Sequence, residues 1–322
     1  MRRTKFYRLT FTLLVSTAAP ALGGHFTSAA DEVRYRIGKE RLPANIADIL
    51  PITDRRPRLR IRVRPKEEPK DADAYFNRGF AYADAGEHEK AIEAYQQALA
   101  LRPDWATAHY DLGWSYSQLG RWQEAIEACE RAIRLRPALP EAHFLLGLSL
   151  AKTGRHREAV AAYKEAVRHN AYYAEAYNNL GNEYLHLQRY EQAASAYKQA
   201  IDLDPDLADA MNGLGETYRK QERYSDAVEF FQEAINIKPD YALAYHNLGV
   251  AQALLVHYRE AVESLREAVR LNPKDAAGRY NLAVISLSLG DRETALEQYR
   301  LLAPDAPELA KKLHALLHEK KR

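Results

Sequence analysis

The chain has 322 residues, 47% hydrophobic and 28% charged, and this composition excludes a fully disordered, collagen-like or membrane-embedded protein. Lysine and arginine total 46 against 44 acidic residues, so the net charge of +2 is too small for nucleic-acid binding by the whole molecule. The single cysteine, Cys129, excludes an internal disulfide framework and a cysteine-ligated zinc site.

Residues 1–30 have the layout of a secretory signal peptide. Basic residues within the first eight positions precede a short apolar run, and small residues permit cleavage after Gly23 or after Ala30. The run is shorter than the roughly 20 apolar residues that cross a bilayer, so no membrane span is predicted in the mature chain. We therefore predict an exported protein, periplasmic or secreted. A mitochondrial transit peptide, also rich in arginine and poor in acid, is the alternative.

Residues 31–71 form a segment rich in proline and arginine that shows no helical period. Between Pro57 and Pro65, apolar and basic residues alternate, and this two-residue period is typical of a short edge strand or of a strand added to a partner. The alternative is a solvated basic linker or arm without fixed structure.

From residue 72 onward the sequence repeats every 34 residues. The period is carried by Gly79, Gly113, Gly147, Gly181, Gly215 and Gly249, by alanines in two further positions, and by Pro103, Pro137, Pro205, Pro239, Pro273 and Pro307. Such a period indicates a stack of one repeated unit. Turn glycines at Gly86, Gly120, Gly154 and Gly290, together with the prolines, divide each unit into two helices. The glycine inside the first helix predicts a close approach by another helix backbone.

The pattern aromatic-x2-Leu-Gly-x2-Tyr, then Ala-x3-Tyr/Phe-x2-Ala-x4-Pro, resembles the tetratricopeptide repeat family, as in Tyr177 to Tyr184. The resemblance covers residues 72–309 in seven units, which start at positions 72, 106, 140, 174, 208, 242 and 276. It implies an all-α fold, a right-handed α-solenoid of stacked helical hairpins. The seventh unit departs from the pattern, with Ser286 at the tyrosine position and Arg279 at the first aromatic position.

A capping helix is predicted after the seventh unit. It begins at Pro307, and Leu309, Leu313, Leu316 and Leu317 share one face at helical spacing. The rest of this helix and a basic tail occupy residues 310–322.

The sequence contains no nucleotide-binding or metalloprotease motif, so we predict a protein that is not an enzyme and has no cofactor. Cys129 stands where other units have an aromatic residue, which indicates a buried packing role. His109 and His143 replace the first aromatic and are expected to pack there. His314 and His318 have a spacing that suits a metal ion, but the sequence supplies no third ligand nearby, and we predict no metal site.

In the resembled family, the first helix of each unit lines a concave groove that binds protein segments. The candidate residues at the corresponding positions are Phe76, Asn77, Phe80, Tyr110, Trp114, Phe144, Asn178, Asn179, Asn182, Asn212, Arg219, Asn247 and Asn281. We interpret the aromatic ones, in units one to three, as a partner site, because contacts between units have no evident use for them. The alternative is that residues 31–71 fold back and cover them.

Four of these asparagines, Asn77, Asn179, Asn247 and Asn281, fall at one repeat position, although other residues interrupt the series. This spacing resembles the asparagine ladder in the repeat array of O-linked N-acetylglucosamine transferases, and it implies pairing with a peptide backbone. We predict a protein–protein interaction scaffold or adaptor that binds an extended or helical segment. The alternative is a non-catalytic accessory subunit of a complex for envelope polysaccharide synthesis or export, or for protein modification.

Overall fold

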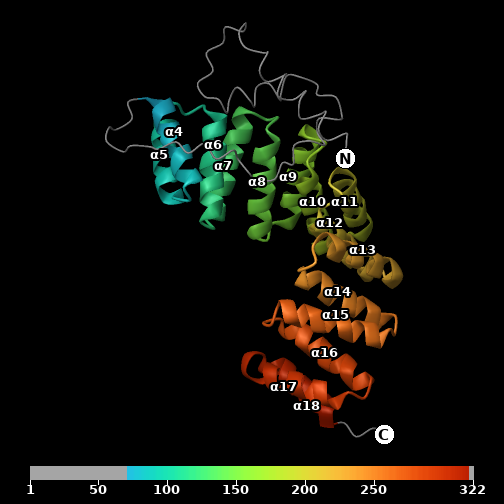
Figure 1. The fold of residues 1–322 in the computed structure, drawn as a ribbon. Coiled ribbons are helices and arrows are strands. Elements are labelled where there is room, and N and C mark those ends of the chain that lie inside the picture. Colours follow the sequence, from blue (N-terminus) through green and yellow to red (C-terminus); the bar gives the residue numbers. More distant parts are fainter. Residues whose placement is uncertain (1–70, 319–322) are drawn as a thin grey trace, which may run out of the picture. The chain divides into compact units, whose positions relative to one another are not determined.

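The computed structural model describes residues 71–318, where it contains fifteen α-helices and no strand (Figure 1). The predicted signal peptide (1–30), the proline- and arginine-rich segment up to residue 70 and the last residues of the tail lie outside the described residues. Within the described part, no helix has the length and apolar character that crossing a membrane requires.

Fourteen of the helices form seven hairpins, each with a first helix of 13 residues and a second of 14. The first helices are α4 (Ala72–Asp84), α6 (Ala106–Gln118), α8 (Pro140–Lys152), α10 (Ala174–His186), α12 (Ala208–Lys220), α14 (Ala242–Leu254) and α16 (Ala276–Ser288). The second helices are α5 (His88–Leu101), α7 (Trp122–Leu135), α9 (His156–His169), α11 (Tyr190–Leu203), α13 (Tyr224–Ile237), α15 (Tyr258–Leu271) and α17 (Arg292–Asp305).

The hairpins pack in chain order. Each first helix contacts the second helix of its own hairpin, and each second helix contacts the first helix of the next hairpin. First helices of neighbouring hairpins also touch one another, whereas within residues 71–318 the second helices of neighbouring hairpins do not. The fold is an all-α helical repeat solenoid. We call the surface formed by its first helices the inner face.

The turn inside each hairpin requires one residue in the left-handed backbone region. Four hairpins place the predicted turn glycines there, with φ between 70° and 82°. The other three place Gln188 (φ 57°), Glu222 (φ 62°) and Val256 (φ 65°) there. A β-branched side chain is the least suited to this conformation, so the turn between α14 and α15 is strained at Val256.

Replacing Val256 with glycine should therefore stabilise the protein by about 1 kcal/mol, because glycine adopts a positive φ without steric cost. The side chain is 66% exposed, so little packing is lost. Urea unfolding followed by circular dichroism measures the change. Gln188→Gly is the matched control and should give a smaller gain, since glutamine is not β-branched; an equal or larger gain there would contradict the explanation.

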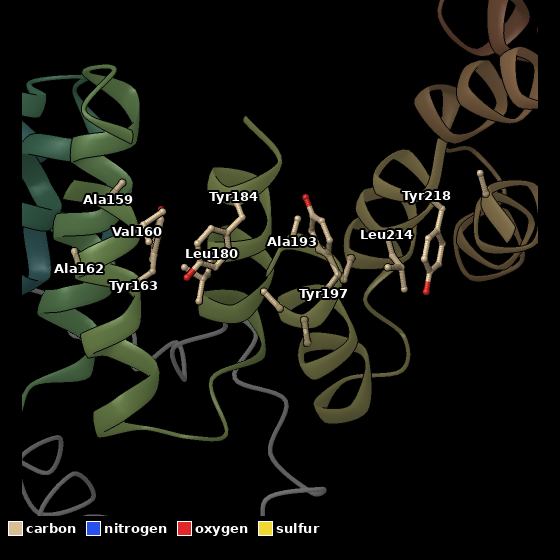
Figure 2. Packing of buried hydrophobic residues seen from close by; sticks show 14 of the residues in the cluster. Ala159, Val160, Ala162, Tyr163, Leu180, Tyr184, Ala193, Tyr197, Leu214 and Tyr218 are labelled. Atoms are coloured by element: carbon tan, nitrogen blue, oxygen red, sulfur yellow. The ribbon is translucent and has the colours of Figure 1, made fainter. Parts of the chain in front are cut away.

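The recurrent glycine of the first helices faces a side chain of the second helix. A methyl group at Gly181 would lie 2.7 Å from the ring of Tyr197. Tyr197 is fully buried and belongs to the hydrophobic cluster shown in Figure 2. Gly79, Gly147 and Gly215 face an aromatic ring of their own hairpin in the same way. The expectation that a helix backbone fills this space is corrected: backbone carbonyls come near in some hairpins, but a side chain is the nearest group.

Cys129 takes the place of that ring in the second hairpin. Its Sγ would lie 3.1 Å from a methyl group at Gly113, and the residue is fully buried. Burial raises the pKa of the Cys129 thiol far above its ordinary value, so the thiol stays protonated and unreactive. The predicted packing role is confirmed.

Helix α18 (Pro307–His318) packs against α16 and α17 and caps the array. Its buried residues are Ala310, Leu313 and Leu317. Leu316, which was expected on the same face, is 37% exposed, because it lies at the edge of the face that Ala310, Leu313 and Leu317 bury. The predicted cap is confirmed and its buried face is corrected.

Candidate functional site

Two of the candidate aromatics on the inner face take part in contacts between repeats. Phe76 stacks on Trp105, with ring centroids 4.4 Å apart, and Phe144 lies 4.9 Å from the ring of Tyr173. Trp105 and Tyr173 immediately precede the first helix of the next hairpin. The interpretation that packing has no use for these positions is therefore wrong for Phe76 and Phe144, which align one hairpin with the next.

The other candidate aromatics, Phe80, Tyr110 and Trp114, are half-buried. Trp114 packs against the buried cluster of the first two hairpins, and His88 meets it edge-on at 5.3 Å. Each of the three keeps part of its surface accessible, and Asn77 on α4 is exposed. The first two hairpins therefore present half-buried aromatic rings on the inner face.

On α10, the amide of Asn182 is oriented by a tyrosine of α11, the second helix of the same hairpin. The ring of Tyr197 passes between Gly181 and Gly213, close enough that neither position has room for a methyl group. The Tyr197 hydroxyl then donates a hydrogen bond of 2.6 Å to Oδ1 of Asn182. Burial raises the pKa of Tyr197, so the hydroxyl stays a donor. Asn182 itself is exposed.

This arrangement explains why a glycine interrupts the asparagine series at residue 213. The Tyr197 ring occupies the space that a side chain there would need. In the preceding hairpin, Asn179 stands at the same repeat position and interacts with the hydroxyl of Tyr163. Asn179 Oδ1 also lies 3.5 Å from the amide nitrogen of Asn182. These two asparagines form a small amide cluster on α10.

The later candidate asparagines connect neighbouring hairpins. Asn247 donates to Oδ1 of Asn212 over 3.0 Å. Asn281 lies 3.2 Å from Nε2 of His246, whose Nδ1 is 2.7 Å from the Asp275 carboxylate. Their polar groups are largely used within the array, so a ladder of amides free to bind a peptide is not continuous across the last three hairpins.

Asn178 and Arg219 have different surroundings on α10 and α12. Asn178 is buried, and its amide nitrogen is 3.4 Å from Oδ1 of Asn179. The half-buried Arg219 makes two hydrogen bonds of 2.6 Å to Glu216, and Lys220 lies 3.8 Å from the same carboxylate. The charge of Arg219 is thus largely neutralised, while Lys220 is exposed.

Three polar residues replace the first aromatic of the repeat in a common way. His109 and His143 each place Nε2 2.8 Å from the carbonyl of the proline six residues earlier, and Arg279 donates to the corresponding carbonyl over 2.9 Å. These side chains tie the first helix to the loop before it. His109 is half-buried and His143 is buried, in agreement with the packing expected for the two histidines.

The two histidines at the carboxyl end lie side by side on α18. His314 and His318 are exposed and their rings are 4.2 Å apart. Among residues 71–318, no group of three or more histidine, cysteine or acidic side chains is arranged to hold a metal ion.

Sequence reasoning missed the residues that precede the first helices. Trp105, Tyr173 and Asp275 stand at one repeat position and contact the fifth residue of the preceding first helix, which is Phe76, Phe144 or His246. Their spacing in multiples of 34 residues was the available signal.

Comparisons with known proteins identify the repeat. One family model, described as tetratricopeptide repeat, matches residues 110–174, 178–242 and 256–310, and a second with the same description matches residues 70–138. No protein with a curated description matches the chain.

Solved structures share the fold. YrrB, described as a TPR protein with an unusual peptide-binding site, is 31% identical over 55% of this chain and 91% of its own, with a TM-score of 0.50. A chain of the APC/C hetero-tetramer Cut9–Hcn1 is 21% identical over 78% of this chain, with a TM-score of 0.62, and only 50% of its length is matched. Pseudomonas aeruginosa PilF is 19% identical over 66% of this chain and 97% of its own, with a TM-score of 0.59. The chain therefore belongs to the tetratricopeptide repeat family, whose fold supports a role as a protein–protein interaction scaffold.

Proposed function

We propose that the inner face is a concave groove that binds an extended or helical segment of a partner protein, and that the protein acts as a scaffold or adaptor. The observation that carries this proposal is the exposed amide of Asn182, which the buried Tyr197 holds in one orientation. An amide oriented in advance loses little conformational entropy when it binds. The similarity to YrrB, whose description names a peptide-binding site, supports the proposal.

The chemistry of the surface suits a polypeptide. A peptide backbone offers one donor and one acceptor per residue, and an asparagine amide can satisfy both. Asn179 and Asn182 supply such groups on α10, while Phe80, Tyr110 and Trp114 on α4 and α6 supply rings that can anchor apolar side chains. The middle of the inner face would thus recognise the backbone of the segment, and its amino-terminal end would recognise apolar side chains.

Contacts within the array narrow the candidate residues. Phe76, Phe144, Asn212, Asn247 and Asn281 connect neighbouring hairpins, so their substitution would disturb the array itself. Of the other candidates, Asn178 is buried. We propose that direct partner contacts are centred on those that keep accessible surface: Asn77, Phe80, Tyr110, Trp114, Asn179, Asn182 and Arg219.

Random 16-residue peptides displayed on phage and selected on the full chain provide the test, with affinities measured by fluorescence anisotropy of the synthetic peptides. Trp114→Ala should weaken binding by about 2 kcal/mol, or about thirtyfold, since interface aromatics carry much of the binding energy. Asn182→Ala should weaken binding by about 1 kcal/mol, because one neutral hydrogen-bonding group is lost. Tyr197→Phe, which keeps the ring and removes the hydroxyl, should weaken it similarly.

Two controls separate binding from packing. Glu233→Ala changes an exposed residue of the outer helix α13 and should leave the affinity unchanged. Trp114→Phe keeps an aromatic ring in the half-buried position and should retain the wild-type melting temperature more closely than Trp114→Ala. Peptides that bind Trp114→Ala and Asn182→Ala as tightly as the wild type would show that the inner face is not the binding site.

A further inference from the structure

A buried tyrosine fills the contact between neighbouring hairpins in the middle of the array. Tyr116, Tyr184 and Tyr218 stand at one repeat position on α6, α10 and α12, and each is at most 8% exposed. Arg121 lies over the Tyr116 ring at 4.6 Å, and Arg223 lies over the Tyr218 ring at 4.1 Å. The contacts of Tyr116 and Tyr218 therefore hold a phenol ring against a guanidinium group.

The hydroxyl of this tyrosine meets the second helix of the preceding hairpin. Gln96 on α5 donates a hydrogen bond of 3.0 Å to the hydroxyl of Tyr116. The corresponding residue three hairpins later is Lys198, whose Nζ lies 5.8 Å from the ring centre of Tyr218. The tyrosine position thus has a polar neighbour on that helix as well as a cation over its ring.

The seventh hairpin has the same arrangement of helices without the tyrosine. Ser286 stands at this position on α16; it is fully buried, and its Oγ has no hydrogen-bond partner among the described residues. Beside it lies an open cavity of about 400 Å³ lined by residues of α15, of α16 and of the turn before α17, including Val262, Arg266, Leu289 and Asp291. In the sixth hairpin Gln252 occupies the position and accepts a hydrogen bond from Ser264, with Ser264 Oγ and Gln252 Oε1 2.7 Å apart.

We propose that the Ser286 cavity is a binding site for one phenol ring, supplied either by a small para-substituted phenol or by a tyrosine side chain of another polypeptide. A cavity left by a missing apolar side chain binds an aromatic molecule of matching size when its walls are preformed. Here Val262 and Leu289 supply apolar walls, and Leu289 is 43% exposed. The site is distinct from the inner-face residues of the proposed function.

The polar groups around the cavity match a phenol. Arg266 stands at the repeat position of Gln96, and Asp291 stands at that of Arg121. Arg266 lies 3.0 Å from Glu263 and 3.7 Å from Asp291, so its guanidinium group stands at the cavity wall, where it can pack against an aromatic ring. The Asp291 carboxylate, which already accepts hydrogen bonds from Thr294, has further lone pairs that can accept one from a phenol hydroxyl.

The charges of the lining disfavour an anionic ligand. Arg259 and Arg266 face Glu260, Glu263 and Asp291, so cations do not outnumber anions. An aromatic carboxylate or a phosphate would therefore gain no net attraction, whereas a neutral phenol loses none.

The probe for this site is p-cresol, which carries the same ring and hydroxyl as a tyrosine side chain. Isothermal titration of the full chain should give a Kd of about 1 mM or tighter, which is typical of a ligand this small. Ser286→Tyr, which fills the cavity from within, should weaken p-cresol binding at least tenfold. Ser286→Ala is the matched control: it keeps the cavity and should lose less than tenfold. Equal binding by wild type and a folded Ser286→Tyr would overturn the proposal.

A measurement on the wild-type chain does not depend on any variant. The methyl NMR signals of Val262 and Leu289 should shift on addition of p-cresol, and unchanged signals at 10 mM p-cresol, about ten times the expected Kd, would equally overturn the proposal. Acetyl-Gly-Tyr-Gly-amide distinguishes the two sources of the ring. If it competes with p-cresol and shifts the same signals, the site takes a tyrosine side chain; if only p-cresol binds, the site takes a small phenol.

Discussion

Replacing Gly181 with valine should destabilise the centre of the array by about 3 kcal/mol. The ring of Tyr197 lies where the new side chain would project, and Gly213 confines the ring from the other side, so the ring has no space into which it can move. Overpacking of this kind forces backbone shifts, which cost about 1 to 3 kcal/mol even for small groups. Hydrogen exchange measured by mass spectrometry should show lost protection in α10, α11 and α12, because stability in a repeat array depends on neighbouring contacts.

Alanine substitutions at two equivalent glycines provide the control. Gly181→Ala places a methyl group 2.7 Å from a confined ring, whereas Gly113→Ala places it 3.1 Å from the smaller side chain of Cys129. Alanine also gains about 1 kcal/mol of helix propensity over glycine. Gly113→Ala should therefore stay within about 1 kcal/mol of the wild type, while Gly181→Ala loses about 2 kcal/mol. Equal effects at the two positions would disprove the role of Tyr197.

Leu313→Ala should destabilise the carboxyl-terminal hairpin by about 3 kcal/mol, the typical cost of truncating a fully buried leucine. Leu313 belongs to the buried cluster that joins α18 to α16 and α17, and this cluster closes the last face of the array. When the cap loosens, that apolar face meets water. Hydrogen exchange should increase in α16, α17 and α18 and remain unchanged in α4 to α10, since each hairpin contacts only its neighbours.

Leu316, three residues further along the same helix, is the control. Its side chain is 37% exposed, so Leu316→Ala should cost less than about 1 kcal/mol. If both leucines cost the same, α18 packs through a different face from the one described.

The sequence alone determined the fold class and the limits of the repeats. Each first helix begins at the residue where the 34-residue period places a new unit, because the period is carried by residues with local conformational roles. The turn glycines adopt positive φ, and the aligned alanines are buried. A local signal repeated seven times leaves little ambiguity. The buried role of Cys129 followed from the same alignment.

Only the tertiary structure decided which inner-face residues are available to a partner. Phe76 and Trp114 are both aromatic residues at positions predicted to line the groove. In the structure, Phe76 stacks on Trp105 before the next hairpin, whereas Trp114 meets His88 of the preceding helix. Likewise Asn182 is exposed and oriented by Tyr197, while Asn247 is used in a contact with Asn212. Contacts between residues 15 or 35 positions apart depend on how helices pack within a hairpin and between hairpins. The spacing of residues along one helix does not determine these contacts.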